Sequence, residues 1–153
     1  MLILTRAGID ETLNHFRDAG QLDNECVVLW LGKRAGENLE VTEYYRPIQV
    51  AKADRFRIPP EGMSALQAKL RARRLMVAAQ IHSHPHEAFH SEADDAWAIV
   101  RHEGAFSLVV PRFAADTTLD NFLDQTKVFQ FSQNATWDEV PKWQVRGQCI
   151  QIT

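Results

Sequence analysis

A short polar stretch between an apolar run and a helical pattern constrains the fold of this chain more than any other feature. Residues 75–81 form an apolar run that predicts a buried strand. Apolar residues recur at helical spacing farther on, at Ala93, Ala96, Trp97 and Val100. Four of the six histidines lie between the two patterns, within nine residues. The sequence therefore predicts a strand, a polar loop and a helix in direct succession, and such strand ends often carry the chemistry of α/β proteins.

Two histidines at the end of this strand have the spacing of a shared binding face. Successive side chains of a strand point to opposite faces, so His82 and His84 point the same way and Ser83 points away. Pro85 cannot continue a central strand, so we expect the chain to turn directly after the pair. Two imidazoles on one face can bind the same metal ion, and the spacing predicts such a site here.

The start of the following helix offers a third ligand. Ser91 is a good helix N-cap, and Asp94 stands at the third helical position, where the helix dipole favours a carboxylate. If the loop folds back, Asp94 can join the two histidines. Two histidines and one carboxylate, with a water at the fourth position, are typical of a catalytic rather than a structural zinc site. The loop residues His86 and His90 are further candidates, which we expect to be exposed or to lie behind the ligands.

Length, charge and cysteine content exclude several classes of protein. A chain of 153 residues with 45% hydrophobic residues predicts one globular domain over residues 1–153. The net charge of −3 gives no reason to expect nucleic acid or an anionic membrane as a partner. No apolar run reaches membrane-spanning length, and the N-terminus lacks the pattern of a signal peptide. Cys26 and Cys149 could bridge, but two distant cysteines are more typical of reduced thiols in a cytoplasmic protein.

The remaining pattern predicts an α/β (α+β) fold. Strands are expected over residues 2–5, 25–32, 39–45, 54–58, 75–82, 106–111, 127–131 and 146–152. Helices are expected over 9–20, 60–74 and 91–103, the last of them ended by Gly104. The first strand is expected at a sheet edge, and the second and third are expected to form a hairpin around a turn at residues 33–38. Trp137 and Trp143 fall in an irregular segment and are expected to cover an edge of the core.

An acid at the start of an apolar strand is a candidate general base. A metal hydrolase needs a carboxylate that takes a proton from water and passes it to the leaving group. Acidic residues are uncommon in strands, yet Glu25 opens the strand that continues through residues 26–32. The residues alone support a solvent-facing strand end equally well, and both interpretations stay open at this point.

These features resemble the signature of the JAMM (MPN+) metalloproteases, which is a distant Glu followed by His-x-His-Pro and then Ser-x-x-Asp. The matching residues are Glu25, His82, His84, Pro85, Ser91 and Asp94, with Gly32 seven residues after the Glu. The resemblance covers residues 9–112 and implies a mixed β-sheet flanked by helices, in a cytidine-deaminase-like three-layer arrangement. It also implies a Zn²⁺ ion held by His82, His84 and Asp94. Glu25 would be the general base of that site, and Ser91 would donate a hydrogen bond to the oxyanion.

One departure from the family pattern bears on the third ligand. The loop between His84 and Ser91 holds six residues, one fewer than the usual spacing. Counting from the histidines nominates Asp95, whereas counting from the serine nominates Asp94. We expect Asp94, because the bond between the cap and the third helical residue fixes where that carboxylate points. Asp95 would lie about 100° further round the helix.

A narrower resemblance, to small bacterial deubiquitinase-like proteins, rests on residues 90–95 and 107–111. Those relatives are associated with ubiquitin-like conjugation operons, often antiphage, that carry an activating and a conjugating enzyme. The resemblance implies cleavage after the C-terminal glycine of a ubiquitin-like protein, in its conjugates or in a precursor. Two alternatives stay open: a non-catalytic MPN scaffold that binds a partner without metal, and a JAMM peptidase acting on a sulfur-carrier protein or a small peptide.

Overall fold

The computed structural model describes residues 1–91, 94 and 98–153. Among these residues eight strands form one sheet in the order β10-β1-β3-β2-β6-β7-β8-β9, and β4 and β5 form a separate two-stranded ribbon. The strands are β1 (Leu2–Leu4), β2 (Val27–Ala35), β3 (Asn38–Tyr45), β4 (Val50–Ala51), β5 (Phe56–Arg57), β6 (Met76–Ser83), β7 (Phe106–Val110), β8 (Lys127–Phe131), β9 (Trp137–Glu139) and β10 (Ile150–Ile152). The described helices are α1 (Arg6–Gly20), α2 (Pro60–Arg73), α4 (Phe122–Gln125) and α5 (Lys142–Gln144), with a 3-10 turn over Arg112–Ala114 and a π-helical turn over Val145–Cys149.

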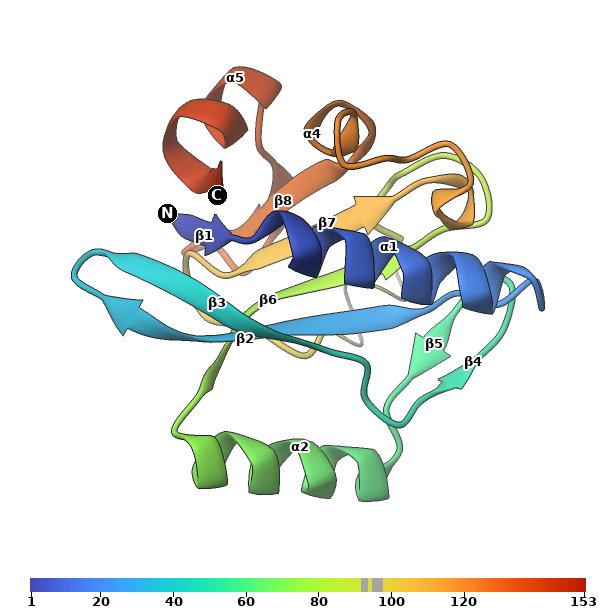
Figure 1. The fold of residues 1–153 in the computed structure, drawn as a ribbon, viewed down its shortest axis with the longest axis horizontal. Helices are drawn as coiled ribbons and strands as arrows, with labels where there is room; N and C mark the ends of the chain where they lie inside the picture. The colour runs from blue at the N-terminus through green and yellow to red at the C-terminus, as the bar shows by residue number, and fades with distance from the viewer. Residues whose placement is uncertain (92–93, 95–97) are drawn as a thin grey trace.

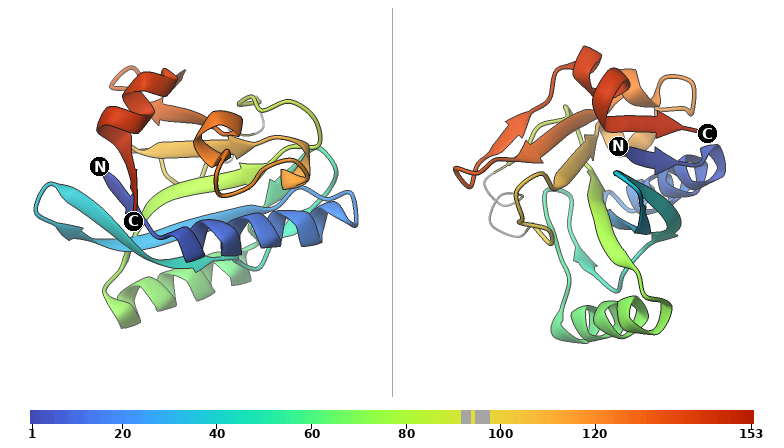
Figure 2. Two further views of the ribbon diagram at one scale, coloured as in Figure 1. Left: turned by 45° about the horizontal axis from the view of Figure 1, so that its top comes forward. Right: turned by 90° about the vertical axis from the view of Figure 1, so that its left-hand side faces the viewer.

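Helices cover both faces of the sheet and so give three layers (Figures 1 and 2). On one face, Leu13 of α1 and Phe122 of α4 belong to the same hydrophobic cluster as Trp30 of β2. On the other face, Leu66 of α2 belongs to a second cluster with Leu29. Neighbouring residues of β2 thus enter opposite clusters, as the alternation of a strand requires. Both parallel and antiparallel pairs occur in the sheet, so the expected mixed sheet flanked by helices is confirmed.

The two central strands β2 and β6 position three of the residues that the sequence singled out, since Glu25 stands two residues before β2, His82 lies in β6 and His84 directly follows it. They run antiparallel, with Val27 opposite His82, while β6 runs parallel to β7. A parallel pair needs a crossover connection, and residues 84–105 supply it. The strand β6 ends at Ser83, between the two histidines, so the polar stretch lies at the C-terminal end of β6.

The ends of the chain pair differently from the sequence expectation. β1 is an inner strand, because it pairs with β3 on one side and with β10 on the other, so the expected edge position is wrong. The C-terminal strand covers Ile150–Ile152 alone, since Val145–Cys149 form the π-helical turn. The hairpin turn is shorter than expected: β2 and β3 extend to Ala35 and Asn38, and Gly36 adopts a φ of 63° at the tip.

The helix expected over residues 91–103 does not reach its predicted end. Residues 98–103 are described and are not helical. Three residues of the helical pattern lie outside the described part of the chain, namely Ala93, Ala96 and Trp97. A long-range contact accounts for the non-helical chain at residue 99: Oε1 of Gln80 accepts the N–H of Ile99 at 2.7 Å, so this N–H does not bond to a carbonyl of its own segment.

Of the two tryptophans near the C-terminal end of the sequence, one packs in the sheet and the other is exposed. Trp137 lies in the regular strand β9 rather than in an irregular segment, and its ring packs 5.0 Å from that of Phe131. Trp143 is 70% exposed, so the expectation that it covers the core is wrong. Cys26 and Cys149 are both free and buried. In the part of the chain that the structure describes, no helix combines the length and the apolar character that crossing a membrane requires.

Candidate metal centre

Four buried side chains from three parts of the chain converge at the C-terminal end of β6. Each of the four offers one ligand atom within 4.8 Å of the other three, and the four are Glu25, His82, His84 and Asp94. Oδ2 of Asp94 lies 3.0 Å from Nε2 of His84 and 3.2 Å from Nε2 of His82. Oε1 of Glu25 lies 3.9 Å from Nε2 of His84. None of the four residues is more than 5% exposed, so the group is a buried polar cluster and not a chance gathering on the surface.

The pairing of β2 with β6 brings Glu25 to the histidines. Val27 stands opposite His82 in this antiparallel pair. Continuing the register by two residues on each strand brings Glu25 opposite His84. Ser83 ties the two chains together beyond the last ladder pair, because its N–H donates to the carbonyl of Cys26 and its Oγ accepts the N–H of Cys26, both at 3.0 Å. Glu25 therefore lies beside His84, although 59 positions separate them in the sequence.

The alternation of β6 places both imidazoles on one face, as the spacing predicted. The ring centroids of His82 and His84 lie 4.9 Å apart. Ser83 points the other way, where it holds Cys26. Phe56 of β5 packs on the His82 ring at 5.3 Å, so the first histidine is held between the ribbon and its neighbouring imidazole.

The two residues that flank β4, Gln49 and Lys52, hold the backbone around Glu25. The N–H of Glu25 donates to the carbonyl of Lys52 at 2.7 Å. The amide of Gln49 bonds both backbone groups of Val27, accepting the N–H at 2.8 Å and donating to the carbonyl at 3.0 Å. Gln49 thus replaces a neighbouring strand at this point, and the start of β2 is fixed on both sides.

The loop after His84 is anchored by backbone bonds to the end of β7. The N–H of His84 donates to Val110 at 2.9 Å, and its carbonyl accepts the N–H of Phe113 at 2.8 Å. Phe113 lies in the run Arg112–Ala114, where φ is between 52° and 62°. Such left-handed residues cost roughly 1–2 kcal/mol each unless they are glycine. The chain is locally strained at the point where it holds the second histidine.

Asp94 is positioned by Ser91 through two reciprocal bonds. The N–H of Asp94 donates to Oγ of Ser91 at 3.1 Å, and the N–H of Ser91 donates to Oδ2 of Asp94 at 2.8 Å. This is the capping arrangement that the sequence predicted, and the same Oδ2 faces both imidazoles. The structure thus brings Asp94 into the group, while Asp95 lies outside the described residues.

Burial and neighbouring charges set the protonation of the group. Burial, reinforced by the charges of Asp94 and Asp54, raises the pKa of Glu25 to about 8. Complete burial lowers the pKa of His82, so this imidazole is neutral, which is the form that binds metals. Burial alone would raise the pKa of Asp94, but its contacts with the two imidazoles outweigh that effect and hold the pKa well below its ordinary value. A firmly ionised carboxylate therefore faces a neutral imidazole.

Several atoms of the cluster have no hydrogen-bond partner within the described residues. They are Nδ1 and Nε2 of His82 and Oε1 of Glu25, and the approach of His82 to Asp94 lacks hydrogen-bond geometry. A buried polar atom left unsatisfied costs about 1–3 kcal/mol, so such atoms mark a site for a further group. Two ligands at about 2.0–2.1 Å from a tetrahedral zinc ion stand about 3.3 Å apart, close to the 3.0 and 3.2 Å found here. The donor set fits a metal ion.

The surroundings of the cluster include residues that the sequence did not single out. The rings of Phe89 and His84 are nearly perpendicular, with centroids 4.6 Å apart, and Phe89 is 52% exposed, so it forms an apolar surface beside the cluster that solvent reaches. His90 lies behind the ligands, 6.2 Å from the His82 ring, with Nε2 3.1 Å from Oγ of Ser107. His86 is exposed. Strand alternation and helix capping cannot find Phe89 or Ser107, because their contacts with the site are set by the loop and by β7.

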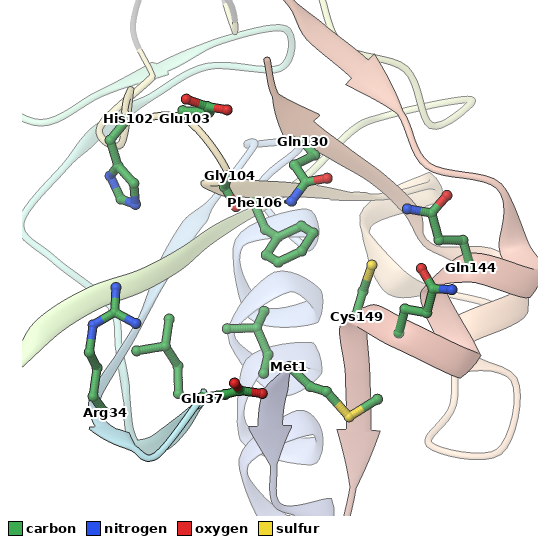
Figure 3. A pocket seen from close by; sticks show the side chains of 13 residues that line it. Met1, Arg34, Glu37, His102, Glu103, Gly104, Phe106, Gln130, Gln144 and Cys149 are labelled. Atoms are coloured by element: carbon green, nitrogen blue, oxygen red, sulfur yellow. Dashed lines mark hydrogen bonds between the residues drawn. The ribbon is translucent and has the colours of Figure 1, made fainter. Parts of the chain in front are cut away.

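A separate hollow lies at the opposite end of the sheet (Figure 3). Its volume is about 410 Å³, and its lining includes Arg34, Glu37, His102 and Gln130. Arg34 lies at the far end of β2 from Glu25, beyond Gly32, which pairs with the start of β6. None of the four clustered residues lines this hollow.

Two histidines and one carboxylate, with a further carboxylate beside them, are typical of metal-dependent hydrolases that activate water. Comparison with known proteins leads to the same class. The family model of prokaryotic homologs of the JAB domain matches residues 10–119. The chain is also 34% identical to "Probable metalloprotease y4jG" of Sinorhizobium fredii over 154 residues, which cover 98% of this chain and 93% of that protein. The chain therefore belongs to the prokaryotic JAB-domain family, as a metalloprotease homologue with a candidate metal site.

Two solved structures share the fold. A protein from Desulfitobacterium hafniense, determined in solution, has a TM-score of 0.72 and 21% identity, with 100% of this chain and 93% of that chain covered. A JAB1/MPN domain protein from Archaeoglobus fulgidus has a TM-score of 0.54 and 16% identity, with 100% and 99% covered. At these identities the likeness concerns the fold, which agrees with the family that the sequence signature resembles.

Proposed function

We propose that this protein is a zinc-dependent peptidase or isopeptidase that cleaves after the C-terminal glycine of a ubiquitin-like protein. One observation carries the proposal: the carboxyl group of Glu25 is buried beside the three candidate ligands, with Oε1 3.9 Å from Nε2 of His84. Within the described residues this oxygen has no hydrogen bond, so it is available to a water molecule. Such a position is that of a general base.

The roles of the side chains follow from their positions. His82, His84 and Asp94 would hold the Zn²⁺ ion. When bound, zinc polarises the substrate carbonyl and makes a water molecule acidic enough to lose a proton near neutral pH. Glu25 takes that proton on its carboxylate and delivers it to the leaving amine. Burial raises the pKa of Glu25 to about 8 in the metal-free protein, and a bound Zn²⁺ would favour the carboxylate that accepts the proton.

Ser91 is proposed as the donor to the oxyanion. Its Oγ accepts the N–H of Asp94, and a hydroxyl group that accepts one bond still has its own proton to donate. The cap fixes this hydroxyl next to the candidate metal ligands. One such donor is worth about 3 kcal/mol of transition-state stabilisation in other hydrolases.

The burial of the cluster supports a substrate with a thin, extended tail. The four clustered residues are at most 5% exposed, so a backbone without bulky side chains reaches them most easily, and glycine supplies such a backbone. Phe89 offers an apolar wall for this tail beside His84. A ubiquitin-like protein that ends in glycine meets these requirements, and its tail could add as a strand to a sheet edge.

The proposed setting is a bacterial ubiquitin-like conjugation pathway in the cytoplasm, with antiphage defence as its purpose. The substrates would be conjugates or precursors of the ubiquitin-like protein, and the activating and conjugating enzymes of the same operon would be partners. The resemblance of residues 90–95 and 107–111 to small bacterial deubiquitinase-like proteins supports this setting. Neighbouring reading frames test it, because a ubiquitin-like protein should be encoded beside this chain.

Cleavage of defined fusions tests the proposed reaction. Zinc-loaded protein would be incubated with bacterial ubiquitin-like proteins fused through their terminal glycine to a reporter domain, and with short peptides that carry the same terminal residues. We expect a cut after the glycine of at least one fusion and no cut by the Glu25→Gln protein. Cleavage of the short peptides alone would support the small-peptide peptidase instead, and a protein without zinc or activity would support the scaffold.

A further inference from the structure

A buried amide two residues before His82 connects the strand to both flanks of Asp94. Gln80 is 1% exposed and lies on β6, on the same face as His82 and His84. Its Oε1 accepts the N–H of Ile99 at 2.7 Å and that of Val100 at 3.4 Å. This arm of the amide holds the chain on the C-terminal side of Asp94.

The nitrogen of the same amide is connected, through Ser107, to the chain on the N-terminal side of Asp94. Nε2 of Gln80 donates to Oγ of Ser107, its partner across the parallel pair of β6 and β7, at 3.0 Å. Oγ of Ser107 lies 3.1 Å from Nε2 of His90, which directly precedes the capping residue Ser91. The His90 ring packs between aromatic side chains of β8 and β9, 5.1 Å from Phe129 and 5.2 Å from Trp137.

The directions of the hydrogen bonds that Gln80 makes are fixed by chemistry. A backbone N–H can only donate, so the amide oxygen must face Ile99 and the amide nitrogen must face Ser107. The serine hydroxyl accepts from Gln80, and its bond with the ring nitrogen of His90 can run in either direction, because the hydroxyl has one proton and a second lone pair. An apolar side chain at position 80 can make neither bond, and a carboxylate could keep the second only by accepting the hydroxyl proton of Ser107.

We propose that Gln80 is a positioning residue that sets Asp94 against His82 and His84. The strand β6 carries His82 and leads directly into His84, and its residue Gln80 holds the chain on both sides of Asp94, at Ile99 directly and at His90 through Ser107. This inference rests on the proposed zinc site and adds a residue that acts on it without touching the ion. Substitution of residues that orient metal ligands commonly costs 10–100-fold in metal affinity.

Metal affinity of a Gln80→Met protein tests the inference. This substitution keeps the length of the side chain and removes both arms. We expect zinc affinity, measured by competition with a chelator, to fall about 10–100-fold, and the visible absorption of the Co²⁺-substituted protein to change because one ligand moves. The matched control is Gln130→Met, because Gln130 bonds the carbonyl of Gly104 at 3.3 Å at the other end of the sheet, and it should keep wild-type affinity and spectrum.

A second variant keeps the test decisive if Gln80→Met does not fold. Ser107→Ala removes only the arm to His90 and should lower zinc affinity by a smaller factor, with thermal unfolding of the metal-free protein recorded beside it. A folded Gln80→Met protein with wild-type zinc affinity and Co²⁺ spectrum would overturn the role of Gln80. If Gln80→Met is unfolded, the same result for Ser107→Ala would overturn it. Either result would leave the proposed peptidase intact. Absence of zinc binding in the wild-type protein would instead overturn the proposed function itself.

Discussion

Oδ2 of Asp94 lies 3.0 Å from Nε2 of His84, although ten positions separate the two residues and His84 directly follows the strand β6. The contact forms because the capping bonds of Ser91 turn this carboxylate toward the strand. The chain thereby gathers three candidate ligands of two types, imidazole and carboxylate, that suit zinc at one point. The neighbour Glu25 completes a centre with the parts that hydrolysis requires.

Removal of the Asp94 carboxylate should abolish tight zinc binding. Asp94→Asn keeps the size of the side chain but loses the charge, so we expect zinc affinity to fall by at least about 100-fold, since a direct ligand matters more than the residues that orient it. Asp95→Asn is the matched control and should bind zinc as the wild type does. Isothermal titration with zinc checks both, and the reverse pattern would move the third ligand to Asp95.

Loss of the Glu25 carboxylate should separate zinc binding from catalysis. Glu25→Gln is expected to retain one zinc ion per chain and to lose at least about 100-fold in cleavage rate, because a positioned acid–base group contributes roughly 10²–10⁴-fold. Metal analysis and the fusion assay measure the two effects on the same sample. A Glu25→Gln protein that cleaves at the wild-type rate would contradict the role of this residue.

In the metal-free protein, the titration of Glu25 should make the free energy of unfolding depend on pH. Its pKa is raised from 4.5 to about 8, so between these values the folded state binds a proton that the unfolded state has released. The free energy of unfolding must then fall as pH rises through this window. His82 acts in the opposite direction, because its lowered pKa makes the folded state bind fewer protons near pH 6.5.

Comparison with Glu25→Gln isolates the first effect, since the His82 contribution is common to both proteins. Denaturant unfolding of the two metal-free proteins at pH 5 and at pH 8 is the measurement. We expect the substitution to stabilise the protein more at pH 8 than at pH 5. An equal difference at both values would mean that the Glu25 pKa is not raised.

A buried bond between α1 and β2 should contribute measurably to stability. Nε1 of Trp30 donates to Oγ1 of Thr12 at 3.1 Å, and both residues are fully buried. Thr12→Val leaves the indole N–H without its partner and should cost about 1–3 kcal/mol in the free energy of unfolding. Thr42→Val, at an exposed position of β3, should change it by less than about 0.5 kcal/mol. Equal costs at the two positions would show that the bond is not the cause.

The parts of the site that local rules govern could be predicted from the sequence. Strand alternation puts His82 and His84 on one face, and a cap fixes Asp94 through Ser91. The position of Glu25 depends instead on how β2 aligns with β6, and no local pattern encodes that alignment. The residues alone left Glu25 undecided, and only the resemblance to a known signature favoured it.

The parts that depend on distant contacts were missed or wrong. The spacing of apolar residues predicted a helix through residue 103, but the Gln80 side chain takes the N–H of Ile99 and the described chain is not helical there. The edge position expected for β1 failed for a similar reason, because the partner β10 comes from the opposite end of the sequence. Which segments meet across a sheet is a tertiary property that propensity does not carry.

The central claim is that His82, His84 and Asp94 hold one zinc ion with Glu25 beside it. Anomalous diffraction at the zinc absorption edge, from crystals grown with the metal, tests this claim most directly. The account predicts one strong peak per chain at bonding distance from the two Nε2 atoms and from Oδ2 of Asp94. A histidine pair without a peak, or a peak bound by His86 at the surface instead, would contradict it.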